Sequence, residues 1–192
     1  MKCILRTLFV ILIVIPAGAN AQTIRFTFTP LLSHDTYHTF GFGSGIDFGG
    51  AIGYRFDSTF QVLATVVFSH RTTQFDAIGG DRSLGARIFT MSCSVAYILI
   101  GRPDRFTAAA TIGGGTMSGA TDPMEVSLGA AGSVSIPSRK FNSGFLEAGI
   151  RLDMPLSPRI GIVIQPAFRQ CTPVASASGE AAIAGGLRVS LF

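Results

Sequence analysis

Charged side chains and long apolar runs are both scarce in this chain. Asp, Glu, Lys and Arg make up 14% of its 192 residues, and the mean hydropathy is +0.46. After residue 21 the sequence has no apolar run of about 18 residues, so we expect no membrane-spanning helix there. If lipid surrounds such a chain, every backbone polar group must be paired within the protein. A closed β-barrel is the arrangement that achieves this without helices.

Cysteine is also rare, and tryptophan is absent. Cys3 precedes the apolar run of the N-terminal segment, so it cannot be a lipoprotein acylation site, which would have to sit at the cleavage point. Cys93 lies in the middle of a predicted strand and Cys171 at the end of another, so we expect no bridge between them. A disulfide framework is therefore excluded as the scaffold.

The N-terminal segment has the pattern of a cleavable export signal. Lys2 and Arg6 flank its start, an apolar run occupies residues 8–15, and Ala19-Asn20-Ala21 is a small-x-small cleavage site. The pattern predicts a signal peptide over residues 1–21 and a mature protein of one domain, residues 22–192, that works outside the cytoplasm.

Neither the net charge nor the glycine clusters indicate a nucleic-acid or nucleotide ligand. Lys2 and Arg6 would leave with the signal, so the formal charge of +4 overstates the basicity of the mature chain. The glycine clusters in residues 41–45 and 113–115 lack the strand, loop and helix context of a phosphate cradle. They suit close strand packing instead. We therefore expect no nucleic-acid partner, no metal and no cofactor.

Alternation with a period of two residues runs through the mature chain, whereas helical periodicity does not. Ile46, Phe48 and Ile52 lie on one face of a predicted strand. Asp47 and Arg55 lie on the other. The alternating segments are residues 24–29, 46–56, 60–68, 89–99, 106–112, 146–153, 160–169 and 183–191. Because turn residues fill the short connections, the pattern predicts an all-β fold, a single closed antiparallel transmembrane barrel that meanders up and down.

Residues 124–136 also alternate in part and make the strand count ambiguous. Counting them as a wall strand gives an odd number, whereas single-chain bacterial barrels have an even number, with short periplasmic turns and longer outer loops. Eight strands result if residues 117–140 form one long outer loop that contains a protruding hairpin. The turns at Asp57, Pro103 and Pro155 then all lie on the periplasmic side, and the stretches near His34, Thr72, Pro123 and Ala175 lie outside.

The faces opposite the apolar rows carry the charges. We predict that these side chains fill the lumen as a paired network, because an eight-stranded interior is just wide enough to be filled by side chains. An unpaired charge there would carry a heavy desolvation penalty. The predicted network consists of Arg25, Asp47, Arg55, Glu147, Arg151, Asp153, Arg159 and Arg188. A gated pore lined by the same residues is the alternative. Small inward residues, such as Gly49, Ala51 and Gly113, also leave room for a narrow cavity.

Aromatic residues gather at both ends of the predicted strands, as in the girdles of outer-membrane barrels. One group, near the periplasmic turns, comprises Tyr54, Phe56, Phe60, Tyr97, Phe106 and Phe192. The other, near the outer ends, comprises Phe40, Phe42, Phe68 and Phe168. Two such belts favour a barrel wall that faces lipid.

With its export signal, eight alternating strands, short inner turns and terminal Leu-Arg-Val-Ser-Leu-Phe, the chain resembles the small OmpA/OmpX-type outer-membrane β-barrels. The resemblance is architectural and covers nearly all of residues 22–192. It implies that the barrel-assembly machinery reads the terminal Phe192, although Ser190 and Arg188 stand where that family usually has apolar residues. It also implies contact with outer-membrane lipids and lipopolysaccharide in a Gram-negative envelope. The expected role is structural or surface interaction, without enzymatic activity.

Two alternatives of another kind are open. His34, His38 and His70 all lie near predicted outer strand ends, beside Ser and acidic residues. A His-Ser-Asp set would suffice for acyl transfer, so the rim could belong to a lipid A-modifying enzyme, or the three histidines could bind a metal. A soluble, lipocalin-like periplasmic barrel is the second alternative; it would need apolar side chains inside and charges outside.

Overall fold

The computed structural model describes residues 25–36, 45–56, 58–77, 80–101, 105–127, 132–172 and 179–190. Within them lie ten strands: β1 Arg25–Thr36, β2 Gly45–Arg55, β3 Phe60–Ala77, β4 Gly80–Gly101, β5 Thr107–Thr121, β6 Met124–Ser127, β7 Ser133–Ile136, β8 Lys140–Pro155, β9 Ile160–Thr172 and β10 Gly179–Ser190. The expected signal peptide, His38, Phe40, Phe42 and Phe192 lie outside the described residues. The prediction of a signal and of one mature domain therefore stays a prediction.

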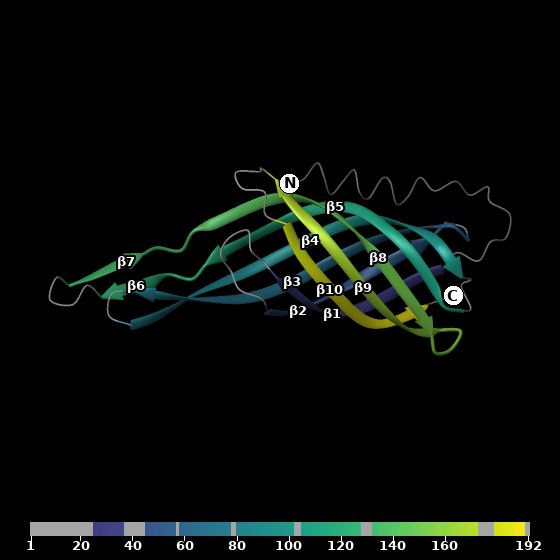
Figure 1. The fold of residues 1–192 in the computed structure, drawn as a ribbon, viewed down its shortest axis with the longest axis horizontal. Helices are drawn as coiled ribbons and strands as arrows, with labels where there is room; N and C mark the ends of the chain where they lie inside the picture. Colours follow the sequence, from purple (N-terminus) through teal and green to yellow (C-terminus); the bar gives the residue numbers. More distant parts are fainter. Residues whose placement is uncertain are drawn as a thin grey trace.

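Eight of these strands form a closed antiparallel barrel in the order β1-β10-β9-β8-β5-β4-β3-β2 (Figure 1). The ring closes at β1, where Thr27 is the register partner of Gly53 on β2 and of Ser190 on β10. The prediction of an all-β barrel with eight wall strands is confirmed. Each wall strand has two neighbours over the height of the ring, so its backbone groups can be paired within the protein.

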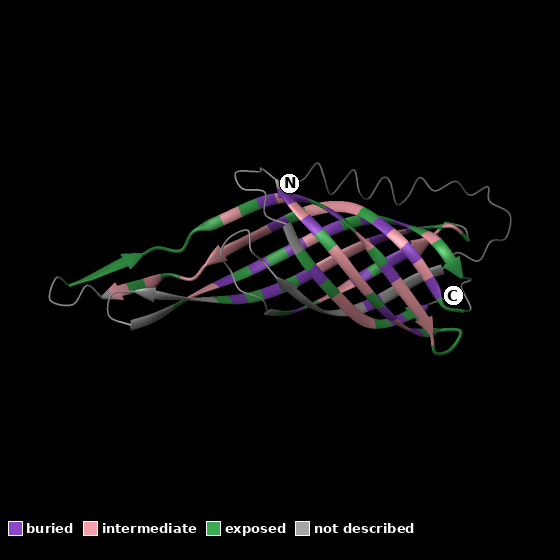
Figure 2. Cartoon of the chain, viewed as in Figure 1, coloured by how far each residue is buried: buried purple, intermediate pink, exposed green. Residues whose placement is uncertain are grey.

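The period-two pattern of the sequence becomes the two faces of the wall. On β2, Ile46 and Phe48 are 68% and 66% exposed, whereas Asp47 between them is fully buried. Figure 2 displays this alternation as bands of buried and exposed residues across the strands. The large apolar rows that were predicted to face outward do so. The inward face carries the buried charges together with small, polar and some apolar side chains, such as Leu63 and Val163. Large apolar side chains outside and charges inside are the reverse of the distribution in a soluble protein.

Glycine allows neighbouring wall strands to approach closely. A Cβ built on Gly49 would overlap the carbonyl oxygen of Val66, and one on Gly113 would overlap that of Cys93. Real Cβ atoms cannot occupy those positions unless the strand moves. The expectation that glycine serves strand packing is confirmed, and the space beside these two glycines is filled by backbone.

Four wall strands, β3, β4, β5 and β8, continue past the ring. They have 18, 22, 15 and 16 residues, whereas β2 has 11. Within the described residues, β2 pairs with β3 as far as Asp47 and Ser69, and β9 pairs with β8 as far as Thr172 and Gly144. Beyond these pairs the sheet consists of residues 70–77, 80–87, 118–121 and 140–143 of β3, β4, β5 and β8. We call this sheet, together with β6 and β7, the extension.

The extension partly confirms and partly corrects the predicted loop over residues 117–140. β6 and β7 pair only with each other in a separate hairpin, as expected, and project at the end of the molecule opposite the C-terminus (Figure 1). The loop boundaries were wrong, however. β5 runs to Thr121 and β8 starts at Lys140, and the fully buried Met117 belongs to the barrel interior.

Candidate functional site in the barrel interior

One charged pair joins β2 to the first residues of the extension on β3. Arg71 donates from Nη2 to Oδ2 of Asp47 over 2.6 Å, and neither side chain is exposed. Asp47 was predicted at an inward position, but its partner was not. Arg71 follows Val67 and Ser69 at two-residue steps on the inward row of β3, so continuing that row into the polar stretch would have found it.

A second pair lies directly across the β8–β9 ladder. Glu147 and Arg169 are register partners, and Arg169 donates from Nε to Oε2 of Glu147 over 3.2 Å. The guanidinium carbon of Arg169 also lies 5.4 Å from the ring centroid of Phe145, a distance at which a cation is attracted to an aromatic face. Glu147 was predicted for the network, whereas Arg169 was missed. Its position opposite Phe168 in the alternation is the signal that identifies it.

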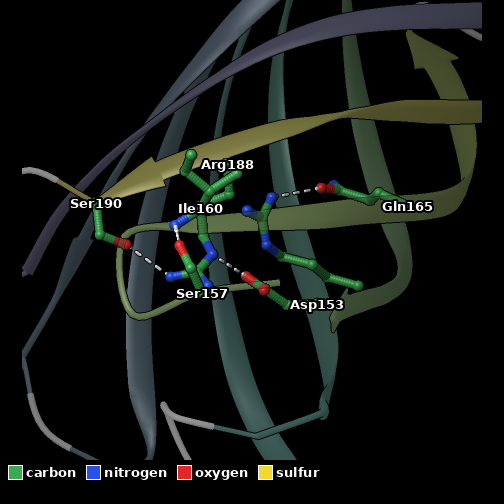
Figure 3. A network of polar contacts seen from close by, with 7 residues as sticks. Asp153, Ser157, Ile160, Gln165, Arg188 and Ser190 are labelled. Atoms are coloured by element: carbon green, nitrogen blue, oxygen red, sulfur yellow. Dashed lines mark hydrogen bonds and ion pairs between the residues drawn. The ribbon is translucent and has the colours of Figure 1, made fainter. Parts of the chain in front are cut away.

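A third group of polar contacts joins β8, β9 and β10 near the short β8–β9 turn (Figure 3). Nε of Arg188 lies 3.0 Å from Oδ2 of Asp153, and Nη1 of Arg188 donates to Oγ of Ser190 over 2.7 Å. Arg151, which is 2% exposed, donates from Nη1 to Oε1 of Gln165 over 3.2 Å. The structure places Arg151, Asp153 and Arg188, three residues of the predicted network, close to one another on the inward face.

The remaining predicted network residues differ in their placement. Arg55 occupies a half-buried position at the end of β2 and, like Arg188, lies near enough to Arg151 to interact with its charge. Arg159 is exposed in the β8–β9 turn, so its predicted inward position is wrong. β9 begins at Ile160, as the alternation indicated, so Arg159 lies in the preceding turn, where the inward–outward alternation of the sheet does not apply. The side chain of Arg25 lies outside the described residues.

Two apolar clusters lie inside the barrel beside these polar groups. The outer apolar cluster lies at the base of the extension and consists of Ala86, Ile88, Met117, Phe145 and Cys171, with Leu84 and Phe141 packed against it. The inner apolar cluster consists of Leu63, Ala96 and Ala109, with Ile98 packed against it. Both clusters therefore add apolar packing to the inward face beside the polar groups.

Among the described side chains of the histidine rim, Ser69 and His70 are not arranged as an acyl-transfer pair. Ser69 is 5% exposed on the inward face of β3, whereas the next residue, His70, is exposed on the outward face. The two side chains therefore lie on opposite faces of one sheet and cannot share a proton. Only the backbone of His34 is described. Among the described residues there is no group of three potential metal ligands, and Cys93 and Cys171 are both free.

In the part of the chain that the structure describes, no helix is long and apolar enough to cross a membrane.

Several solved structures share this architecture. A major outer membrane protein from Thermus thermophilus aligns with a TM-score of 0.60 at 14% identity, covering 86% of this chain and 99% of that chain. Neisserial surface protein A aligns with a TM-score of 0.56 at 11% identity, covering 89% of this chain and 99% of that one. For the outer membrane protein OprG from Pseudomonas aeruginosa the TM-score is 0.55 at 8% identity, with 88% and 96% covered.

These likenesses concern the fold. No protein-family model matches the sequence, and a search of curated proteins found no match either. The chain has the fold of the small outer-membrane β-barrel proteins, as the sequence predicted.

Proposed function

We propose that the protein is an integral outer-membrane barrel with a closed lumen, which presents the extension at the surface of a Gram-negative cell. The single observation that carries this proposal is the reversed polarity of the wall. Large apolar side chains cover the outside, while ion pairs such as Asp47–Arg71 lie inside at full burial. In water this exterior would be a large aggregation-prone patch, whereas in lipid it is the required surface. A soluble, lipocalin-like barrel needs the opposite distribution.

The height of the apolar exterior fits a bilayer. On β3 the outward apolar row runs from Phe60 to Phe68, and on β4 it runs from Phe89 to Leu99. These segments match the roughly 9 to 11 residues with which a tilted strand crosses the hydrocarbon core. Outward His70 and Arg87 follow at the next positions of the same two strands. The polar ends therefore support a lipid boundary at the base of the extension.

The two ends of the barrel differ, and this difference supports one orientation of the barrel across the outer membrane. Short turns join β2 to β3 and β8 to β9 at one end, whereas the extension projects from the other. Bacterial barrels have short periplasmic turns and longer outer parts. The extension accordingly faces the outside, and export by a signal over residues 1–21 and assembly by the barrel-assembly machinery belong to the same proposal.

The interior supports a structural role more than conduction. Three arginines meet carboxylate partners, two across neighbouring strands and Arg188 across β9 to Asp153, and two apolar clusters lie beside these groups. An open aqueous pore would need unobstructed polar walls along its whole length. We therefore assign the function to the outer surface, where the extension can contact lipopolysaccharide or external ligands, and assign the interior to stability.

Fractionation of cells expressing the full chain tests the proposal. We expect the protein in the outer-membrane fraction, resistant to extraction by urea and carbonate, and migrating faster on unheated than on heated SDS gels because the folded barrel stays compact. A soluble periplasmic protein of the same cell serves as the control for incomplete separation. Recovery of folded protein in the periplasmic fraction without detergent would overturn the proposal.

A further inference from the structure

A groove of about 1000 Å³ lies on the surface where the barrel wall continues into the extension. Its floor contains the rings of Phe48, Phe68 and Phe89, from three adjacent strands. The ring centroids of Phe48 and Phe68 are 6.1 Å apart, and those of Phe68 and Phe89 are 5.1 Å apart. All three rings are exposed, at 66%, 47% and 37%. The floor therefore continues the apolar exterior of the wall.

Basic and polar side chains line the groove on the side of the extension. Phe68 pairs with Phe89 in the β3–β4 register, and the next outward pair is His70 with Arg87. Lys140 lines the groove from β8. Two residues along a strand span roughly 7 Å, so cationic groups stand one short step beyond the aromatic floor. Ser118, Ser138 and Asn142 add hydrogen-bonding groups to the same lining.

Arg87 is held in place and still has donors to offer. Its Nη2 lies 3.2 Å from Oδ1 of Asp122, while 78% of the side chain is exposed. A guanidinium carries five N–H donors, and this contact uses one of them. The backbone N–H of Asp122 donates to the carbonyl oxygen of Gly85, which holds the main chain of Asp122 against β4. The planar guanidinium suits bidentate contact with a phosphate.

We propose that this groove binds a phosphorylated lipid of the surrounding leaflet, with an acyl chain on the three phenylalanines and a phosphate between Arg87 and Lys140. The proposal rests on the proposed function, since it requires the base of the extension to lie at the lipid boundary. A free phosphate would leave the aromatic floor unused, and a lipid with an uncharged headgroup would leave the cations unused. An anionic lipid satisfies both halves of the groove.

Binding is measured by native mass spectrometry on the full-length protein released from a neutral detergent. The probes are bisphosphorylated lipid A, the same lipid after removal of its phosphates, and inorganic phosphate. We expect lipid A to remain bound, dephosphorylated lipid A to bind at least about tenfold more weakly (a difference of about 1.4 kcal/mol at 25 °C), and inorganic phosphate not to displace lipid A. Equal binding of the two lipids, or displacement by inorganic phosphate, would overturn the proposal.

The matched variants are Arg87→Gln with Lys140→Gln, and Arg105→Gln with Arg159→Gln. The second pair removes the same charge from exposed positions in the short turns β4–β5 and β8–β9, away from the groove. We expect the first pair to lose the preference for phosphorylated lipid and the second to keep it. Equal loss in both pairs would reduce the effect to net charge and refute the site.

Each variant is first checked for membrane fractionation and for faster migration without heating, and only folded protein enters the binding measurement. Failure of the native chain at this step would contradict the proposed function. A folded, membrane-inserted chain that binds lipid A equally well with and without its phosphates would contradict only the proposed lipid site.

Discussion

The wall and the extension are made from the same strands but are built for different surroundings. Along β3 the outward row is apolar at Val66 and Phe68 and then polar at His70 and Thr72. The strand itself continues through this change without a break. A strand therefore does not end where lipid ends; only the chemistry of its outward residues changes there.

The outward chemistry changes between Phe68 and His70 on β3, and between Phe89 and Arg87 on β4. Phe68 pairs with Phe89 and His70 with Arg87, so the change lies at one height on both strands. An apolar outward row suits lipid, whereas a polar outward row suits water. The predictions below contrast the two sides of this boundary.

The largest effect is expected from a buried pair inside the wall. Glu147→Gln removes the carboxylate that Arg169 contacts, and Arg169 stays charged at 7% exposure. Removal of one partner of a buried pair lowers the free energy of unfolding by about 3 to 5 kcal/mol. We expect a lower unfolding temperature of the detergent-solubilised barrel, and partial recovery when Arg169→Met is added. An unaltered melt together with raised ion conductance in planar bilayers would mean that these charges line an open pore.

A charge placed on the outward row comes next in size. Val66→Arg puts a cation on the lipid face of β3 and should destabilise the inserted barrel by about 2 to 4 kcal/mol. Thr72→Arg, on the outward row of the same strand in the extension, should have almost no effect because its surroundings are water. Unfolding by urea in lipid vesicles measures both. Equal destabilisation by the two substitutions would contradict a lipid boundary between Val66 and Thr72.

The exposed pair of the extension should matter much less than the buried one. Asp122→Asn removes the carboxylate from a contact in which Arg87 is 78% exposed, and such pairs contribute about 0 to 1 kcal/mol. We expect a melting temperature close to that of the native chain. A loss as large as that of Glu147→Gln would show that the extension is not solvated.

The smallest effect on stability is expected from cutting the chain beside the hairpin. Arg139 is exposed just before β8, and β6 and β7 pair only with each other. Trypsin added to intact cells should cleave there and leave the melting of the barrel unchanged. Complete protection until the outer membrane is breached would contradict the orientation.

The sequence predicted which face of the barrel wall most residues occupy. It did not predict which side chains pair across strands or where the longest strands end. Alternation identified the outward rows and the inward positions of Asp47 and Glu147, because side-chain period depends only on local geometry. It could not identify Arg71 or Arg169 as their partners, since pairing depends on the register between strands.

The length of β3 and β4 was missed for a related reason. Residues 70–83 are polar at most positions, so both faces of the strands in the extension look alike in the sequence and no period of two stands out. The even number of wall strands did exclude β6 and β7 from the ring. In the candidate site, the inward position of Arg159 failed because Arg159 lies in the turn before β9, and alternation determines the direction of a side chain only within a strand.

The closure of the ring at β1 and β10 has a kinetic consequence. Thr27 and Ser190 come from opposite ends of the described chain, so this seam is the contact with the greatest sequence separation, whereas β3 and β4 meet through a short local turn. Local hairpins form fast, and contacts between distant residues form late. A sheet without its last strand has two unpaired strand edges, which are not tolerated in hydrocarbon. We therefore expect membrane insertion and closure of the barrel to occur as one cooperative event, which begins only once the last strand is available for pairing.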